Sequence, residues 1–157
     1  MFRRHPLLSL VTLAYLGFVG WLTLSPQLPL GEGTDGFVWR VLDVLDTIPG
    51  TRWIDYSDVE FGANVAMFAP IGMFLVLLFG RGRWWLAILL SFALSSIIEL
   101  AQLLIFTTRV ADVRDLVSNS IGGIVGTLLV IAITAPKARR IARARAAESR
   151  HPVLAQR

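Results

Sequence analysis

The chain has 157 residues, of which 55% are hydrophobic and none is cysteine, a composition typical of an integral membrane protein rather than a water-soluble domain. The absence of cysteine excludes disulfides and thiol chemistry, and the two histidines, both in terminal segments, all but exclude an imidazole-based zinc site. The net charge of +4 does not indicate nucleic-acid binding, because most basic residues lie beside apolar segments. We therefore expect no metal ion, no cofactor and no nucleic-acid partner.

Four apolar segments are each long enough, at about 20 residues, to cross a bilayer as an α-helix. The first follows Arg3 and Arg4, as a signal peptide would, but its apolar stretch is longer than a typical signal sequence has. Ser25 and Pro26 follow it in place of a small-x-small cleavage site, so we expect a retained first span. The predicted spans are Leu7–Leu24, Gly62–Phe79, Trp84–Phe106 and Leu116–Ala135. The predicted fold class is therefore all-α, a polytopic membrane protein with four transmembrane helices.

The loop between the first two spans, Ser25–Phe61, is long and rich in acidic residues. Apolar residues recur in it at helical spacing, and these are Phe37, Val38, Val41, Leu42, Leu45 and Ile48. Asp35 is in position to cap the start of this helix, and Pro49–Gly50 to end it. The pattern predicts a short amphipathic helix on the outer face of the membrane. A helix that packs over the bundle as a lid is an alternative, and the two are compatible.

The third span contains Glu99 in an otherwise apolar run, and Gln102 shares its helix face one turn further on. A charge at membrane depth costs roughly 2.5–3.5 kcal/mol on insertion scales, so other groups must offset it. Ser91, Ser95 and Ser96 are candidates for hydrogen bonds to neighbouring helices near Glu99. An ionisable residue inside a membrane is a functional candidate by default, although Glu99 also fits a strut that fixes helix packing.

Further polar residues fall at the same predicted depth in neighbouring segments. Asn64 lies in the first turn of the predicted second span. Asp112, Asp115 and Asn119 form nearly one stripe at the start of the fourth span, and Arg109 lies just before it. Seven polar residues from three segments therefore converge on one layer. We take them as candidate ligand-binding residues: Asn64, Glu99, Gln102, Arg109, Asp112, Asp115 and Asn119.

Most of these residues also have a structural interpretation. Asp112 and Asp115 are acids of the kind that the helix dipole favours at a helix start. Arg109 can pair with Asp112, or can clamp a phosphate or carboxylate at the outer surface. Asn64 and Asn119 can form hydrogen bonds between helices. A divalent cation held by Glu99 and the two aspartates is conceivable, but the spacing does not require one.

Small residues in the fourth span predict close packing. Gly122 and Gly126 form a small-xxx-small pair, and Gly123 lies beside them. Such a pair allows the backbone of a neighbouring helix to approach closely. We therefore expect these glycines to have a structural role.

The basic residues predict the orientation of the chain. Eleven of the 15 Lys and Arg residues lie at the N-terminus, between spans 2 and 3, or after span 4. The positive-inside rule makes that side cytoplasmic, so we expect both termini inside and the candidate layer near the outer surface. Residues 137–157 are predicted to be a disordered basic tail that anchors to anionic lipids, and residues 1–136 to form the membrane domain.

Three motifs combine the residues described above, and they run from Asn64 to Gly72, from Ser96 to Gln102 and from Arg109 to Gly123. With the sequence from Leu22 to Pro26, they closely resemble the VanZ-like family, over roughly residues 10–131. The resemblance implies a multi-pass protein of the bacterial cytoplasmic membrane. The namesake of the family is associated with resistance to the glycopeptide antibiotic teicoplanin, and the resemblance implies no particular reaction.

These observations predict a VanZ-like membrane protein that acts on or binds a lipid-linked cell-envelope component and modulates teicoplanin susceptibility without catalysis. Its ligand would be that precursor or the antibiotic itself, among membrane lipids. The alternative is a membrane-embedded enzyme that uses Glu99 as acid and base on an envelope lipid or polymer. No nucleophile has a base at diagnostic spacing, which favours binding. A transporter or flippase is a third hypothesis, but four spans leave little room for an alternating pathway unless the protein oligomerises.

Overall fold

The computed structural model describes residues 6–24, 36–105 and 113–148. These residues form α-helices and one short 3₁₀-helix, with no strand among them. The elements in chain order are α1 (Pro6–Leu24), α2 (Phe37–Asp46), α3 (Tyr56–Phe79), η2 (Arg81–Arg83), α4 (Trp84–Ile105) and α5 (Val113–Glu148). Four of the helices, α1, α3, α4 and α5, are long and apolar enough to span a membrane, as predicted.

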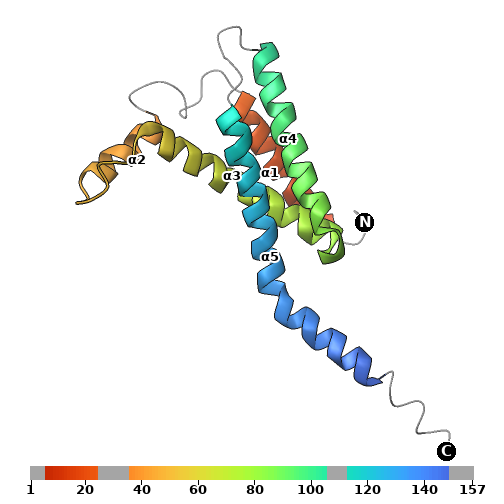
Figure 1. The fold of residues 1–157 in the computed structure, drawn as a ribbon. Helices are drawn as coiled ribbons and strands as arrows, with labels where there is room; N and C mark the ends of the chain where they lie inside the picture. Colours follow the sequence, from red (N-terminus) through yellow and green to blue (C-terminus); the bar gives the residue numbers. More distant parts are fainter. Residues whose placement is uncertain (1–5, 25–35, 106–112, 149–157) are drawn as a thin grey trace, which may run out of the picture.

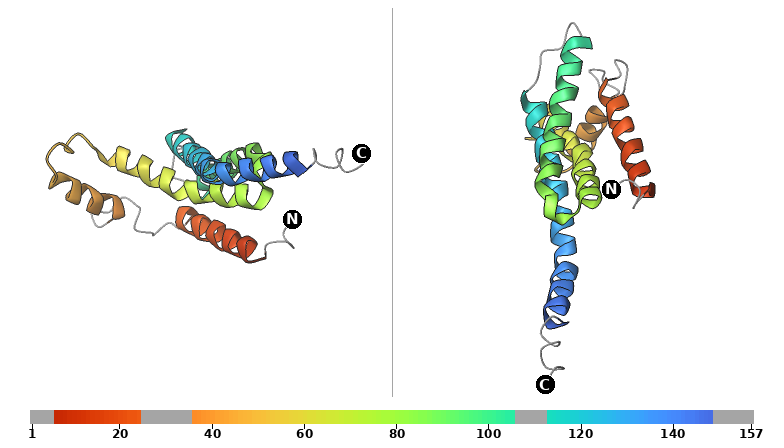
Figure 2. Two further views of the ribbon diagram at one scale, coloured as in Figure 1. Left: turned by 90° about the horizontal axis from the view of Figure 1, so that it is seen from below. Right: turned by 90° about the vertical axis from the view of Figure 1, so that its right-hand side faces the viewer.

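The helix α5 crosses α3 and makes its most extensive contact there, with a smaller contact to α4 (Figure 1). The helix α1 packs on α3 and α4. The start of α1 and the η2 turn lie at the same end of the bundle, while α2 lies beyond the start of α3 (Figure 2). The second half of α5 extends past the η2 end of the bundle.

The buried core of the bundle is small, and the outer surface of the spanning helices is apolar. Phe68 and Ile71 of α3, Ala87 of α4 and Val19 of α1 are among its fully or almost fully buried residues. Many leucine, isoleucine and valine side chains on the same helices are exposed, which suits contact with lipid tails. The Tyr15 hydroxyl donates a hydrogen bond to the carbonyl of Met67 at 2.9 Å, and this bond joins α1 to α3.

The helix α3 begins six residues earlier than predicted, at Tyr56 instead of Gly62. The Asp55 side chain accepts a hydrogen bond from the Asp58 backbone N–H at 3.0 Å, and the Asp58 side chain accepts from the Asp55 backbone N–H at 3.3 Å. This capping box satisfies N–H groups that a helix start otherwise leaves unpaired. The hydropathy pattern missed it because the first turn is charged. Asn64 consequently lies in the third turn of α3, about 12 Å from its start, instead of in the first.

The helix α5 continues past the end predicted at Ala135 and reaches Glu148, with Pro136 inside it. Residues 137–148, which we predicted to be disordered, are therefore helical. The prediction was wrong because it equated the loss of hydropathy with the loss of helix. Alanine and arginine make up most of this segment, and both have high helix propensity. The division into a membrane domain over 1–136 and a separate tail stays a prediction.

A helix occurs in the first loop where the pattern predicts one, and α2 covers Phe37–Asp46. Its N-cap is Gly36, without a side-chain hydrogen bond, and not the predicted Asp35. The ring of Trp39 lies 5.5 Å from that of Tyr56, so α2 contacts the first turn of α3. Whether α2 lies on the membrane surface stays a prediction.

Backbone atoms of α3 and α5 come into contact at three glycines, Gly72 of α3 and Gly122 and Gly126 of α5. A Cβ atom at Gly126 would overlap the carbonyl of Ala69, and one at Gly72 would overlap the carbonyl of Gly123. The predicted small-xxx-small pair therefore packs closely, and its partner is α3.

This contact predicts a large difference between two glycine-to-alanine changes. Gly126→Ala should lower stability by roughly 1–3 kcal/mol, since the added Cβ must push α3 and α5 apart. Gly17→Ala is the matched control, because a Cβ at Gly17 of α1 meets no atom within 4 Å. Thermal unfolding of the purified proteins in detergent measures both. Equal melting temperatures for the two variants would contradict the close contact.

Candidate functional site

One hydrogen bond joins α3 to α5 near the end of the bundle where α5 begins. Asn64 Nδ2 donates to Asp115 Oδ1 at 2.8 Å, and the pair is partly buried. Asn64 can reach α5 because the glycine contacts bring the two backbones together on the same side. The bond gives Asn64 the interhelical role that the sequence left open beside ligand binding.

A second hydrogen bond, one turn further along α5, joins that helix to α4. Asn119 Nδ2 donates to Ser95 Oγ at 3.0 Å, and both residues are at least 95% buried. Ser91 and Ser96 instead donate to carbonyls of their own helix, those of Ala87 and Phe92. Within the described part of the chain, Ser95 is therefore the one of the three serines with a hydrogen bond to another helix.

A third hydrogen bond joins α4 to α1. Gln102 Nε2 donates to the backbone carbonyl of Thr23 at 2.9 Å. Glu99 lies on α4 between Ser95 and Gln102, one turn from each, and it is partly buried. The three bonds thus connect all four spanning helices around the turn that carries Glu99. We call this set the polar layer, and it consists of Thr23, Asn64, Ser95, Glu99, Gln102, Asp115 and Asn119.

The polar layer contains one buried acceptor that stands out. Asn119 Oδ1 is fully buried and receives no hydrogen bond from the described residues. A buried amide oxygen without a donor is costly, by about 1–3 kcal/mol, and calls for a partner such as water or a ligand group. This atom lies on the side chain that already contacts Ser95, one turn from Glu99.

Two of the seven predicted site residues, Arg109 and Asp112, lie outside the described residues. Their roles as anion clamp and helix-start acid stay predictions. The cation proposed for Glu99 and the aspartates also stays untested, because that set includes Asp112. Within the described ranges no group of three or more metal-ligating side chains is close enough to hold a metal ion.

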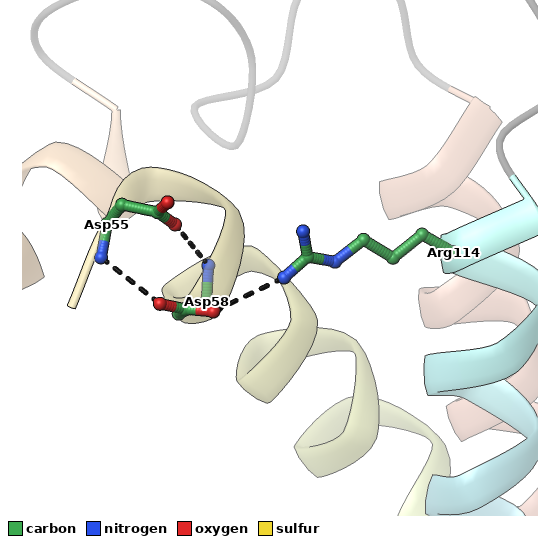
Figure 3. A network of polar contacts seen from close by, with 3 residues as sticks. All are labelled: Asp55, Asp58 and Arg114. Carbon is green, nitrogen blue, oxygen red and sulfur yellow. Dashed lines mark hydrogen bonds and ion pairs between the residues drawn. The ribbon is translucent and has the colours of Figure 1, made fainter. Parts of the chain in front are cut away.

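The sequence interpretation missed a polar contact at the starts of α3 and α5. Arg114 donates to Asp58 Oδ1 at 3.4 Å (Figure 3). The Arg114 guanidinium also lies 5.6 Å from the ring centre of Phe61. Asp58 therefore serves both the capping box with Asp55 and an ion pair with α5. Both charged side chains are more than 40% exposed, so the pair adds at most about 1 kcal/mol. The Asp-x-x-Asp spacing was the available signal for the cap, but nothing in the sequence links it to Arg114.

The fold and the polar layer define a class of protein, a four-span helical membrane protein with a polar, partly acidic layer towards one end of the bundle. The family model described as VanZ/LLP1 matches residues 12–134, and the chain belongs to this family. The match confirms the resemblance drawn from the three motifs. No curated protein and no solved structure matches the chain.

Two neighbouring serines test the hydrogen bond at the centre of the layer. Ser95→Ala should lower stability by roughly 1–3 kcal/mol, because it leaves the buried Asn119 amide group without its partner. Ser96→Ala, the same change one residue on, should have little effect, because the hydrogen bond that Ser96 makes among the described residues stays within its own helix. Chemical or thermal unfolding in detergent compares the two, and a Ser96 variant as unstable as the Ser95 variant would contradict the assignment.

Proposed function

We propose that the protein binds the head group of a lipid-linked cell-envelope component at the polar layer and thereby modulates susceptibility to teicoplanin. The setting is the cytoplasmic membrane of a bacterium, with the polar layer towards its outer face. The observation that carries the proposal is that the VanZ/LLP1 match covers every residue of the layer. The orientation follows from the basic residues, most of which lie at the opposite end.

The chemistry of the layer suits a ligand rich in hydrogen-bond donors. Glu99 and Asp115 contribute carboxylates, and Asn119 Oδ1 is a buried acceptor that receives no bond from the described residues. Sugar hydroxyls and peptide N–H groups are donors, so the sugar and peptide part of a cell-wall precursor complements these groups. Arg109, predicted at the same depth, would add a guanidinium for the phosphates of a lipid-linked molecule.

Binding requires no catalytic residue, and the described residues favour it over hydrolysis or transfer through a serine. Ser91 and Ser96 donate to backbone carbonyls, and Ser95 accepts from Asn119. Among the described residues, none of the three serines is paired with a carboxylate that would activate it as a nucleophile. An enzyme that uses Glu99 directly as acid and base is the second candidate, because a carboxylate is the group such a reaction needs.

Antibiotic susceptibility of a Gram-positive host tests the proposal. Expression of the wild-type protein should raise the inhibitory concentration of teicoplanin by several dilution steps and leave that of vancomycin nearly unchanged. No change at verified expression would contradict the proposed function. As a control for the Glu99 substitutions described next, Asp46→Asn removes one negative charge from an exposed residue at the end of α2. This variant should behave as wild type.

Two substitutions at Glu99 separate binding from catalysis. Glu99→Gln retains an acceptor oxygen of similar reach, so a binding role predicts partial loss of tolerance, while Glu99→Leu removes the acceptor and should abolish it. An acid and base role predicts that both variants are equally inactive, because glutamine cannot exchange the proton. Membrane levels of each variant, measured by immunoblot, show that the comparison is made at equal abundance.

A further inference from the structure

A second feature lies at the other end of the bundle, away from the polar layer. One face of α5 and the side chain of Arg81 line a shallow, open groove of about 630 Å³. Its walls are mostly apolar, and the lining residues are Arg81, Leu128, Ile131, Ala132, Ala135, Ala138, Arg139 and Ala142. Small alanine side chains keep the groove open over about 21 Å of helix.

Arg81 is fixed in this groove by neutral partners. Its guanidinium reaches from η2 to α5 and donates to the carbonyl of Ile131 and to the hydroxyl of Thr134. A guanidinium has five N–H donors, so these contacts leave others for a ligand. No carboxylate pairs with Arg81 within the described ranges, and the sequence has no acidic residue from Gly80 to Ile98 or from Leu116 to Ala147. The charge of Arg81 is therefore held in place without a protein counter-charge.

The groove lies where we expect the membrane to change from hydrocarbon to head groups. Trp84 and Trp85 are exposed next to η2, and tryptophans at a helix end favour the interface. Arg81 of η2 bonds to Ile131 and Thr134, so these residues of α5 lie at the level of η2. Leu128 precedes them in α5, whereas Arg139 follows them on the part of α5 that extends past the bundle. The groove is thus apolar at one end and positively charged at the other.

Pro136 adds an acceptor between the two ends. Proline has no N–H, so the carbonyl of Ala132, which lines the groove, lacks its usual helical donor. A hydroxyl group of a bound molecule can donate to such a carbonyl. The groove therefore combines an apolar wall, two guanidinium groups and a backbone acceptor.

We propose that this groove binds an anionic glycerophospholipid, with its phosphate between Arg81 and Arg139 and an acyl chain along the alanine wall. A soluble phosphate would use the arginines but not the apolar wall, and a zwitterionic lipid would bring its own positive charge to the two arginines. This inference is independent of the proposed function, since it uses no residue of the polar layer.

Native mass spectrometry of the full-length protein in detergent tests the lipid site. The protein is titrated with phosphatidylglycerol or with phosphatidylcholine of the same acyl chains. We expect one phosphatidylglycerol to remain bound at energies that remove phosphatidylcholine. Arg139→Gln should reduce this retention several-fold, and Ala135→Trp, which fills the groove without changing charge, should do the same.

The matched control is Arg140→Gln, which removes the same charge from the adjacent residue outside the groove lining. Equal loss in the Arg139 and Arg140 variants would overturn the proposal in favour of general attraction to the basic helix. Equal retention of the two lipids would overturn it as well, as would full displacement of phosphatidylglycerol by glycerol phosphate, which has no acyl chain. Arg81 itself is left unchanged in the test, because its bonds to α5 also hold the bundle together.

Discussion

The contact between the backbones of α3 and α5 is the constraint on which the rest of the bundle depends. The absence of a side chain at Gly72, Gly122 and Gly126 lets carbonyl groups of one helix lie against the other. In a membrane, helix association relies on such packing and on interhelical hydrogen bonds, because lipid tails are as apolar as the side chains. The approach also brings Asn64 within hydrogen-bond distance of Asp115. A wider separation would remove that bond between the two helices.

The polar layer extends this constraint to the other two spanning helices. The bonds from Asn119 to Ser95 and from Gln102 to Thr23 hold α4 against α5 and α1, on either side of the turn that carries Glu99. A functional side chain on a rigid, cross-linked element keeps its position better than one on a loop. The same bonds therefore stabilise the bundle and hold Glu99 in a defined place, as the proposed binding role requires.

The sequence was sufficient for features that depend on composition and local spacing. Four spans, the helix in the first loop and the packing of Gly122 and Gly126 follow from hydropathy and small-residue patterns, and the structure confirms them. The start of α3 depends on a capping box in a charged segment, which hydropathy does not detect. Which residues Ser95 and Arg114 contact depends on how the helices are rotated about their own axes relative to their neighbours. A single sequence does not contain that information. Arg109 and Asp112 lie outside the described residues, so the complete candidate layer remains a prediction.

Accessibility of Glu99 from outside the cell tests the central claim, an outward-facing polar layer around this residue, most directly. The chain has no cysteine, so single cysteines can be introduced at Glu99, at the neighbouring exposed Leu100 and at Ala138 on the α5 extension. Intact cells are then treated with a membrane-impermeant thiol reagent. We expect Glu99→Cys to be labelled, Leu100→Cys to stay unlabelled in lipid, and Ala138→Cys to react only after permeabilisation. Labelling of Ala138→Cys but not of Glu99→Cys in intact cells would contradict the account.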